Sequence, residues 1–216
     1  GVVFSGDQGG QLYIRGGSPV MNKVMLDGLT IYNPFHSIGL FSVFETDLIQ
    51  TADVYSAGFG AEYGGRVSAV VDLKTRDANR NRMAAKVGLT TFTSKLLLET
   101  PLKKYQQGKG NSSLAVSYKN SFSRESSRIL YNYATSDKLP YNFGDLFIKA
   151  SFNSSTGGYT KLYGFHFTDN VAFPGSTSYN WTSTGLGGKF MIVPEQAKTR
   201  VDGYFLWSKY DIQKKE

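Results

Sequence analysis

Apolar and polar residues follow different patterns in the two halves of the sequence. Up to about residue 80, short apolar segments are separated by turns rich in glycine, asparagine and aspartate, which is typical of short strands. One turn is an Asp-Gly pair between two apolar runs, a strong local signal for a tight hairpin. The predicted strand regions are 11–17, 22–32, 51–57 and 66–75, with one helical turn expected in 41–50. Residues 1–80 are therefore predicted to form a small α+β domain.

Residues 81–216 contain longer segments in which apolar and polar residues alternate with a period of two. These predicted strands are 84–90, 93–101, 111–121, 144–153, 159–169, 183–193 and 198–210. One apolar face on successive strands is typical of a transmembrane β-barrel wall, although a soluble β-sandwich alternates in the same way. The connections favour the barrel. Apart from the first hairpin, long polar loops at 122–143 and 170–182 lie at one end, and short turns lie at the other.

The strand predicted at 159–169 carries a specific expectation about its two faces. Tyr163, Phe165 and Phe167 are expected to form its apolar, lipid-facing side. His166 and Thr168 alternate with them and are expected to face the barrel lumen.

Composition narrows the function classes further. The chain has no cysteine, which excludes a disulfide scaffold and a cysteine-based metal site or nucleophile. The formal net charge is +7, but Lys and Arg are scattered, so an ordinary basic surface explains the charge better than a nucleic-acid site does. The two histidines, His36 and His166, are far apart, so we expect no metal site. No Ser-His-acid arrangement stands out, and we expect neither a cofactor nor enzymatic activity.

The glycines in AGFGAEYGGR, residues 57–66, raise the question of a nucleotide site. Gly58, Gly60 and Gly64 have the spacing G-x-G-x-x-x-G and precede a strand, whereas a dinucleotide site needs G-x-G-x-x-G before a helix. Close packing of the backbone is the better interpretation, because glycine lets chains approach tightly.

Four motifs, in order, resemble the plug domain of TonB-dependent receptors from the Gram-negative outer membrane. They are a strand ending in Ile14-Arg15-Gly16, the apolar strand VMLDG ending in Asp27-Gly28, the segment ADVYSAGFG, and EYGGRVSAVVDLKT with Gly64-Gly65. The shortened glycine motif and the loose third element are similar to variants in the Bacteroidetes branch. The strand pattern extends the resemblance to about residue 210.

This resemblance implies an α+β plug domain at 1–80, followed by antiparallel transmembrane β-barrel strands at 81–216 that form an incomplete barrel. Complete family members enclose the plug in 22 strands, so we expect the sequence to be a fragment without the signal segment, the TonB box and most of the barrel. The plug motif residues would be structural: Ile14, Arg15, Gly16, Asp27, Gly28, Gly64 and Gly65. Arg15 is the charged residue most expected to be buried.

The implied function is import of a scarce nutrient across the outer membrane with energy transduced by TonB. The implied partners are the TonB complex, a nutrient ligand and outer-membrane lipid, with a surface lipoprotein as a further candidate and no nucleic acid. A surface receptor that signals without transport, or a soluble β-rich binding module, are the alternatives. The loop after the Asp-Gly strand tends to line the ligand cavity in the family, so Tyr32, Asn33, Phe35 and His36 are candidate ligand contacts.

Overall fold

The structure is a computed structural model, in which the chain divides into two compact units, Gly1–Arg76 and Asp77–Glu216. It describes residues 2–5, 11–14, 16–36, 39, 41–56, 58–130, 139–172, 177–194 and 199–215. Among these residues no helix is long and apolar enough to cross a membrane.

The first unit is built on a four-stranded mixed sheet with strand order β4-β3-β6-β5. Its strands are β3 (Asn22–Leu26), β4 (Leu29–Ile31), β5 (Ile49–Tyr55) and β6 (Ala69–Thr75). A separate pair, β1 (Val2–Ser5) and β2 (Gln11–Ile14), and two 3-10 turns, η1 (Pro19–Met21) and η2 (Ala61–Tyr63), complete the unit. The predicted strands are confirmed. In 41–50 a hydrogen-bonded turn replaces the expected helical turn, and the Leu48 amide donates to the Glu45 carbonyl at 3.0 Å.

The core of this unit lies between the sheet and its connecting segments. Strand β3 pairs in parallel with β6 and antiparallel with β4, so its side chains have neighbours on both sides. The buried apolar side chains are Ile14, Val24, Met25, Leu26, Leu29, Ile31, Val43, Leu48, Ala69, Val70 and Leu73. Burial of these aliphatic groups is the main stabilising contribution, at about 25 cal/mol per Å² removed from water.

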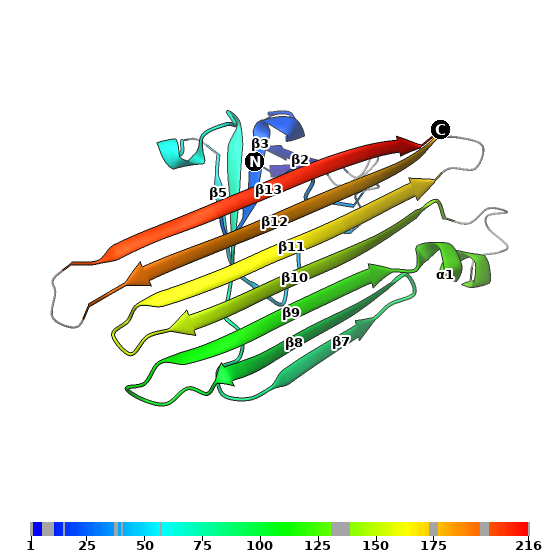
Figure 1. The fold of residues 1–216 in the computed structure, drawn as a ribbon. Helices are drawn as coiled ribbons and strands as arrows, with labels where there is room; N and C mark the ends of the chain where they lie inside the picture. The colour runs from blue at the N-terminus through cyan, green and yellow to red at the C-terminus, as the bar shows by residue number, and fades with distance from the viewer. Residues whose placement is uncertain are drawn as a thin grey trace. The chain divides into compact units, whose positions relative to one another are not determined.

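The second unit is one antiparallel sheet in which seven strands follow each other in chain order (Figure 1). The strands are β7 (Ala84–Leu89), β8 (Thr93–Lys103), β9 (Asn111–Ser121), β10 (Tyr141–Asn153), β11 (Tyr159–Ala172), β12 (Ser178–Ile192) and β13 (Val201–Lys215). One helix, α1 (Ser123–Leu130), follows β9. The predicted α+β domain followed by barrel-type strands is therefore confirmed.

The last strands are longer than the pattern predicts. Strand β11 continues to Ala172 and β12 begins at Ser178, so the loop expected at 170–182 is reduced to 173–177. Of the two loops expected to be long, only the one after β9 stays long, at 122–140. Asn, Thr and Trp side chains made this region look like a polar loop, whereas they lie on paired strands.

The ladder register assigns every side chain of this sheet to one of two faces. We call them the apolar face and the charged face. The middle of the apolar face has the rows Val116–Ile148–Gly164–Leu186–Trp207 and Leu114–Ala150–Leu162–Gly188–Phe205. The charged face carries Glu99, Lys119, Asp145, Lys149, Lys161, Asp169 and Lys189. An ionised group facing lipid is costly, so in a barrel wall the charged face points away from lipid.

The expectation for the faces of β11 is wrong. Phe165 lies opposite Phe147, and Tyr163 lies opposite Lys149, which places the three aromatic residues, Phe167 included, on the charged face. His166 lies opposite Leu146, so it belongs to the apolar face and does not face the lumen with the charges. Alternation within one strand gives only the period, and aromatic residues occur on both faces of this sheet. Pairing with the neighbouring strand determines whether a side chain lies on the apolar or the charged face.

Glycines on β12 and β13 lie opposite aromatic residues on neighbouring strands. Gly185 is paired with Phe165, and Gly188 with Phe205. A Cβ at either glycine would overlap the opposing ring. The missing side chains thus make room for rings that lie across the strand, which is a known way to stabilise glycines in sheets.

Adjacent residues on β13 allow a matched test of the two faces. Phe205 is in the middle apolar row and is 53% exposed, whereas Tyr204 is on the charged face and is 71% exposed. We expect Phe205→Arg to prevent assembly in the outer membrane, at a cost of roughly 2–4 kcal/mol near the bilayer midplane. Tyr204→Arg should assemble normally. Heat-modifiable mobility of the full-length protein in membrane fractions measures assembly, and equal tolerance of the two substitutions would contradict the face assignment.

Candidate functional site

The segment after β4 holds the four residues expected to contact a ligand. It folds back on itself, because the Val43 amide donates to the Pro34 carbonyl at 3.2 Å and the His36 amide to the Phe41 carbonyl at 2.9 Å. An isolated bridge between Phe35 and Ser42 continues this pairing. The Asn33 carboxamide oxygen accepts a bond from the Phe35 amide at 3.3 Å, which forms a tight turn at the start of the loop.

The four candidate side chains of this loop differ in their exposure. Tyr32 is 49% exposed, and Asn33 and Phe35 are half-buried. His36 is 4% exposed. A ligand could therefore contact Tyr32, Asn33 and Phe35 without rearrangement, whereas His36 packs inside. The role of these residues in ligand binding stays a prediction.

Asp27 does more than form the predicted turn. It has a φ of 51°, and Gly28 has a φ of 91°, as the central residues of a type I′ hairpin require. In addition, its carboxylate accepts a bond from the Thr75 amide at 2.9 Å and another from the Thr75 hydroxyl. The hairpin of β3 and β4 is thereby tied to the end of β6. No local pattern predicts this contact, because the two residues are 48 positions apart.

The other plug motif residues have local structural roles. Ile14 is a core residue, and Gly16 has a φ of 76°. Arg15 lies outside the described residues. Gly65 has a φ of 92°, which favours glycine, and the Gly64 carbonyl accepts a bond from the Lys23 ammonium group at 3.0 Å.

The close packing expected around the glycines of 57–66 is not what these residues provide. A Cβ at Gly58 or Gly65 would meet no atom within 4 Å, and a Cβ at Gly60 would overlap only the carboxylate end of the Glu62 side chain, not another backbone segment. The close approach occurs instead at Gly17, where a Cβ would overlap the Ser68 side chain. Glycine is thus needed at Gly65 for its backbone conformation and at Gly17 for space.

A small polar cluster covers the β5 and β6 strands of the first unit. The Lys74 ammonium group lies 3.1 Å from the Asp53 carboxylate and 3.5 Å from that of Asp72. A hydrogen bond with Tyr55, together with burial and the Asp72 charge, raises the pKa of Tyr63 to about 12. The Tyr63 phenol therefore stays neutral at physiological pH and is not poised to act as a base.

The charged face of the second unit contains paired and deeply buried ions. Lys119 lies 3.0 Å from Asp145 across β9 and β10. Asp77, just before β7, accepts a bond from the Ser151 hydroxyl at 2.9 Å and pairs with Lys161 at 2.8 Å. Burial raises the pKa of the Asp77 carboxyl, but Lys161 and Ser151 outweigh that effect and hold the pKa below its usual value. Asp77 is therefore ionised at neutral pH.

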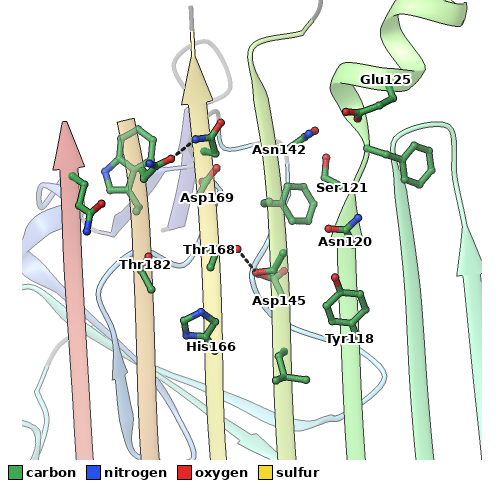
Figure 2. A pocket seen from close by; sticks show the side chains of 18 residues that line it. Tyr118, Asn120, Ser121, Glu125, Asn142, Asp145, His166, Thr168, Asp169 and Thr182 are labelled. Atoms are coloured by element: carbon green, nitrogen blue, oxygen red, sulfur yellow. Dashed lines mark hydrogen bonds between the residues drawn. The ribbon is translucent and has the colours of Figure 1, made fainter. Parts of the chain in front are cut away.

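A shallow groove of about 800 Å³ lies at the end of the sheet next to α1 (Figure 2). A row of carboxamides crosses four strands here, with Asn142, Asn170, Asn180 and Gln213 directly opposed. Asn170 donates to Asn180 and accepts from Arg124 of the α1 helix. In Figure 2 Thr168, Thr182 and His166 lie along the next positions of the strands. The groove offers carboxamide and hydroxyl groups together with the carboxyl groups of Glu125, Asp145 and Asp169. In the described part of the chain no cluster of metal ligands is found.

Comparison with known families identifies the first unit. Residues 1–71 match the family model described as TonB-dependent Receptor Plug Domain. The match covers the first three sequence motifs and the fourth as far as residue 71. No curated protein matches the sequence significantly.

The contact between Asp27 and Thr75 predicts a measurable stability effect. Asp27→Ala leaves the Thr75 amide and hydroxyl without this acceptor, and we expect the plug to lose about 1–3 kcal/mol of unfolding free energy. Hydrogen exchange of the β6 amides in the full-length protein measures the loss. Asp53→Ala, which removes an exposed partner of Lys74 on the same sheet, should change exchange much less. Equal effects of both substitutions would contradict the structural role of Asp27.

Proposed function

We propose that the chain is part of a TonB-dependent receptor that imports a scarce nutrient with energy transduced by TonB, because residues 1–71 match the plug domain of these receptors. The family is one of outer-membrane transporters and receptors of Gram-negative bacteria. The proposed location is accordingly the outer membrane, and the proposed partners are the TonB complex, outer-membrane lipid and the nutrient. A surface lipoprotein and an origin in the Bacteroidetes branch belong to the same proposal.

The observation that supports this function best is a plug domain followed directly by a sheet with one charged and one apolar face. On β12 the apolar face runs from Thr184 to Ile192. At about 3.4 Å per residue this segment is ~27 Å long. If the strand is tilted by about 40°, the segment spans ~20 Å along the membrane normal, which is near the ~25 Å height of an outer-membrane apolar band. We propose that residues 1–80 act as the plug and 81–216 as the first barrel strands.

Two alternatives make different predictions. A signalling receptor would share the plug and the wall but would not carry its ligand inward. A soluble binding module would be extracted without detergent. The plug match and the apolar face of the sheet argue against this alternative. We assign no enzymatic activity, in keeping with a family of transporters and receptors.

Uptake by whole cells tests the proposed function. Cells with the full-length gene, cells without it, and cells without TonB would be supplied separately with ferric siderophore, cobalamin, oligosaccharide and peptide, each radiolabelled. We expect one class to accumulate only when both the gene and TonB are present. Binding without accumulation would favour the signalling receptor, and accumulation that is independent of TonB would contradict the proposed mechanism.

The plug loop gives a second prediction, once that class is known. We expect the combined substitution of Tyr32, Asn33 and Phe35 by alanine to lower binding at least tenfold while surface abundance stays normal. His36→Ala should instead lower abundance, because this side chain is buried. Val20→Ala, at an exposed apolar residue of η1, is the control. Unchanged binding in the triple variant would show that the ligand contacts lie elsewhere.

A further inference from the structure

The groove beside α1 is crossed by a line of side-chain amides on four adjacent strands (Figure 2). We call it the carboxamide row, and its members are Asn142, Asn170, Asn180 and Gln213. Asn170 and His166 are an even number of positions apart on β11, so the row lies on the apolar face. Asp145 and Asp169, which also line the groove, belong to the charged face. In a barrel wall the row therefore lies outside the lumen and does not line a transport path.

The carboxamide row lies beyond the end of the apolar band. On β13 this face is apolar up to Trp207, and its next two positions, Lys209 and Asp211, form an ion pair at 2.8 Å. Ionised groups are costly in hydrocarbon, so the band ends before Lys209. Gln213 lies four residues further on, about 14 Å along the strand and ~10 Å along the membrane normal at a tilt of about 40°. The interfacial layer outside the hydrocarbon is about 5–8 Å thick, so the row lies at its outer edge.

The end of the sheet that carries the row is the extracellular end in the proposed topology. The longest connection of the sheet, 122–140, is at this end, and outer-membrane barrels have their longer loops outside. The lipid of the outer leaflet of a Gram-negative outer membrane is lipopolysaccharide, whose headgroup is a phosphorylated oligosaccharide. At the height of the row, the outer wall of the barrel would therefore be next to sugar rings.

The start of α1 holds the carboxamide row in place. The Arg124 amide donates to the Asn142 carboxamide oxygen at 3.3 Å, and the Arg124 guanidinium donates to the Pro140 carbonyl at 3.1 Å and to the Asn170 carboxamide oxygen. Asn170 in turn donates to the Asn180 carboxamide oxygen. Among the described residues, these bonds leave the amide groups of the half-buried Asn142 and Asn180 as available donors. The donors are thus positioned before a ligand binds, which lowers the entropic cost of binding.

The groups of this surface suit a sugar better than a phosphate. A sugar hydroxyl both donates and accepts hydrogen bonds, as do a carboxamide and the hydroxyls of Thr168 and Thr182 on the next positions of the strands. A phosphate is bound best by arginine or lysine. The Arg124 guanidinium, however, is bonded to oxygens of the chain, and Lys209 is paired with Asp211.

We propose that the carboxamide row binds the core oligosaccharide of lipopolysaccharide on the outer side of the barrel wall. This inference rests on the proposed function, because it assumes that the sheet lies in the outer membrane with α1 outside. The bound sugar is continuous with the lipid that covers the apolar rows of the same strands. One lipopolysaccharide molecule thus places its acyl chains on the apolar band and its sugars on the row.

Titration of the purified full-length receptor in detergent tests this site, with native mass spectrometry to count bound lipid. Two probes are compared, intact lipopolysaccharide and lipid A, which lacks the core oligosaccharide. We expect the variant Asn180→Ala/Gln213→Ala to bind lipopolysaccharide about tenfold more weakly and lipid A as the wild type does. The matched control is Asn111→Ala/Asn153→Ala, which removes a directly opposed pair of carboxamides from the charged face at the other end of the sheet. This control should bind both probes normally.

Two outcomes of the titration would overturn the proposal. Unchanged lipopolysaccharide binding by Asn180→Ala/Gln213→Ala would show that the row contacts no sugar, and an equal loss of lipid A binding would show that its effect is not on the oligosaccharide. The titration needs neither nutrient nor TonB, so a failure of uptake does not affect it. Recovery of the receptor without detergent would instead contradict the proposed function before the titration begins.

Photocrosslinking in living cells identifies what occupies the groove. A benzophenone amino acid in place of Thr182, between the row and the apolar band, should form an adduct that an antibody against the core oligosaccharide detects. The same probe in place of Asn153, on the charged face, should form none. The adduct should disappear in a strain whose lipopolysaccharide lacks the core sugars. An adduct with a protein, such as a surface lipoprotein, or no adduct at all would overturn the proposal.

Discussion

An ionised side chain that faces lipid lacks solvent, and the register of the seven-stranded sheet meets this constraint on β9 to β12, whose charged residues all lie on the charged face. Lys119 and Asp145 form their ion pair only because they are directly opposed across β9 and β10. A slip of one residue in any of these four strands would move its charges to the apolar face. The same slip would also place the aliphatic residues of that strand among the ions. Pairing of the charges and continuity of the apolar rows thus select one register.

Packing of the aromatic residues selects the same register independently. Phe165 lies over Gly185 on the charged face, and Phe205 lies over Gly188 on the apolar face. In a slipped register these rings would meet side chains, at a cost typical of overpacking, about 1–3 kcal/mol. Electrostatics and packing therefore agree at the level of single residue pairs. Such agreement is what lets one arrangement of strands predominate over its alternatives.

Local features could be predicted from the sequence, and non-local ones could not. The Asp27-Gly28 hairpin and most strand positions follow from turn chemistry and periodicity, which act within a few residues. The side to which Phe165 points depends on pairing with β10, and aromatic character alone suggested the wrong face. The contacts of Asp27 with Thr75 and of Gly17 with Ser68 join residues about 50 positions apart. Nothing in either local sequence reveals such a partner.

The two units each have their own stabilising interactions, and in the first unit these converge on strand β6. Strand β6 is an inner strand of the plug sheet, paired with β3 and β5, and Asp27 holds its last residue, Thr75. The next two residues, Arg76 and Asp77, are held by different units. Strand β6 is thus stabilised from within the first unit, by its two neighbouring strands and by Asp27. Local unfolding of this unit should therefore reach β6 last, because a strand paired on both sides separates last.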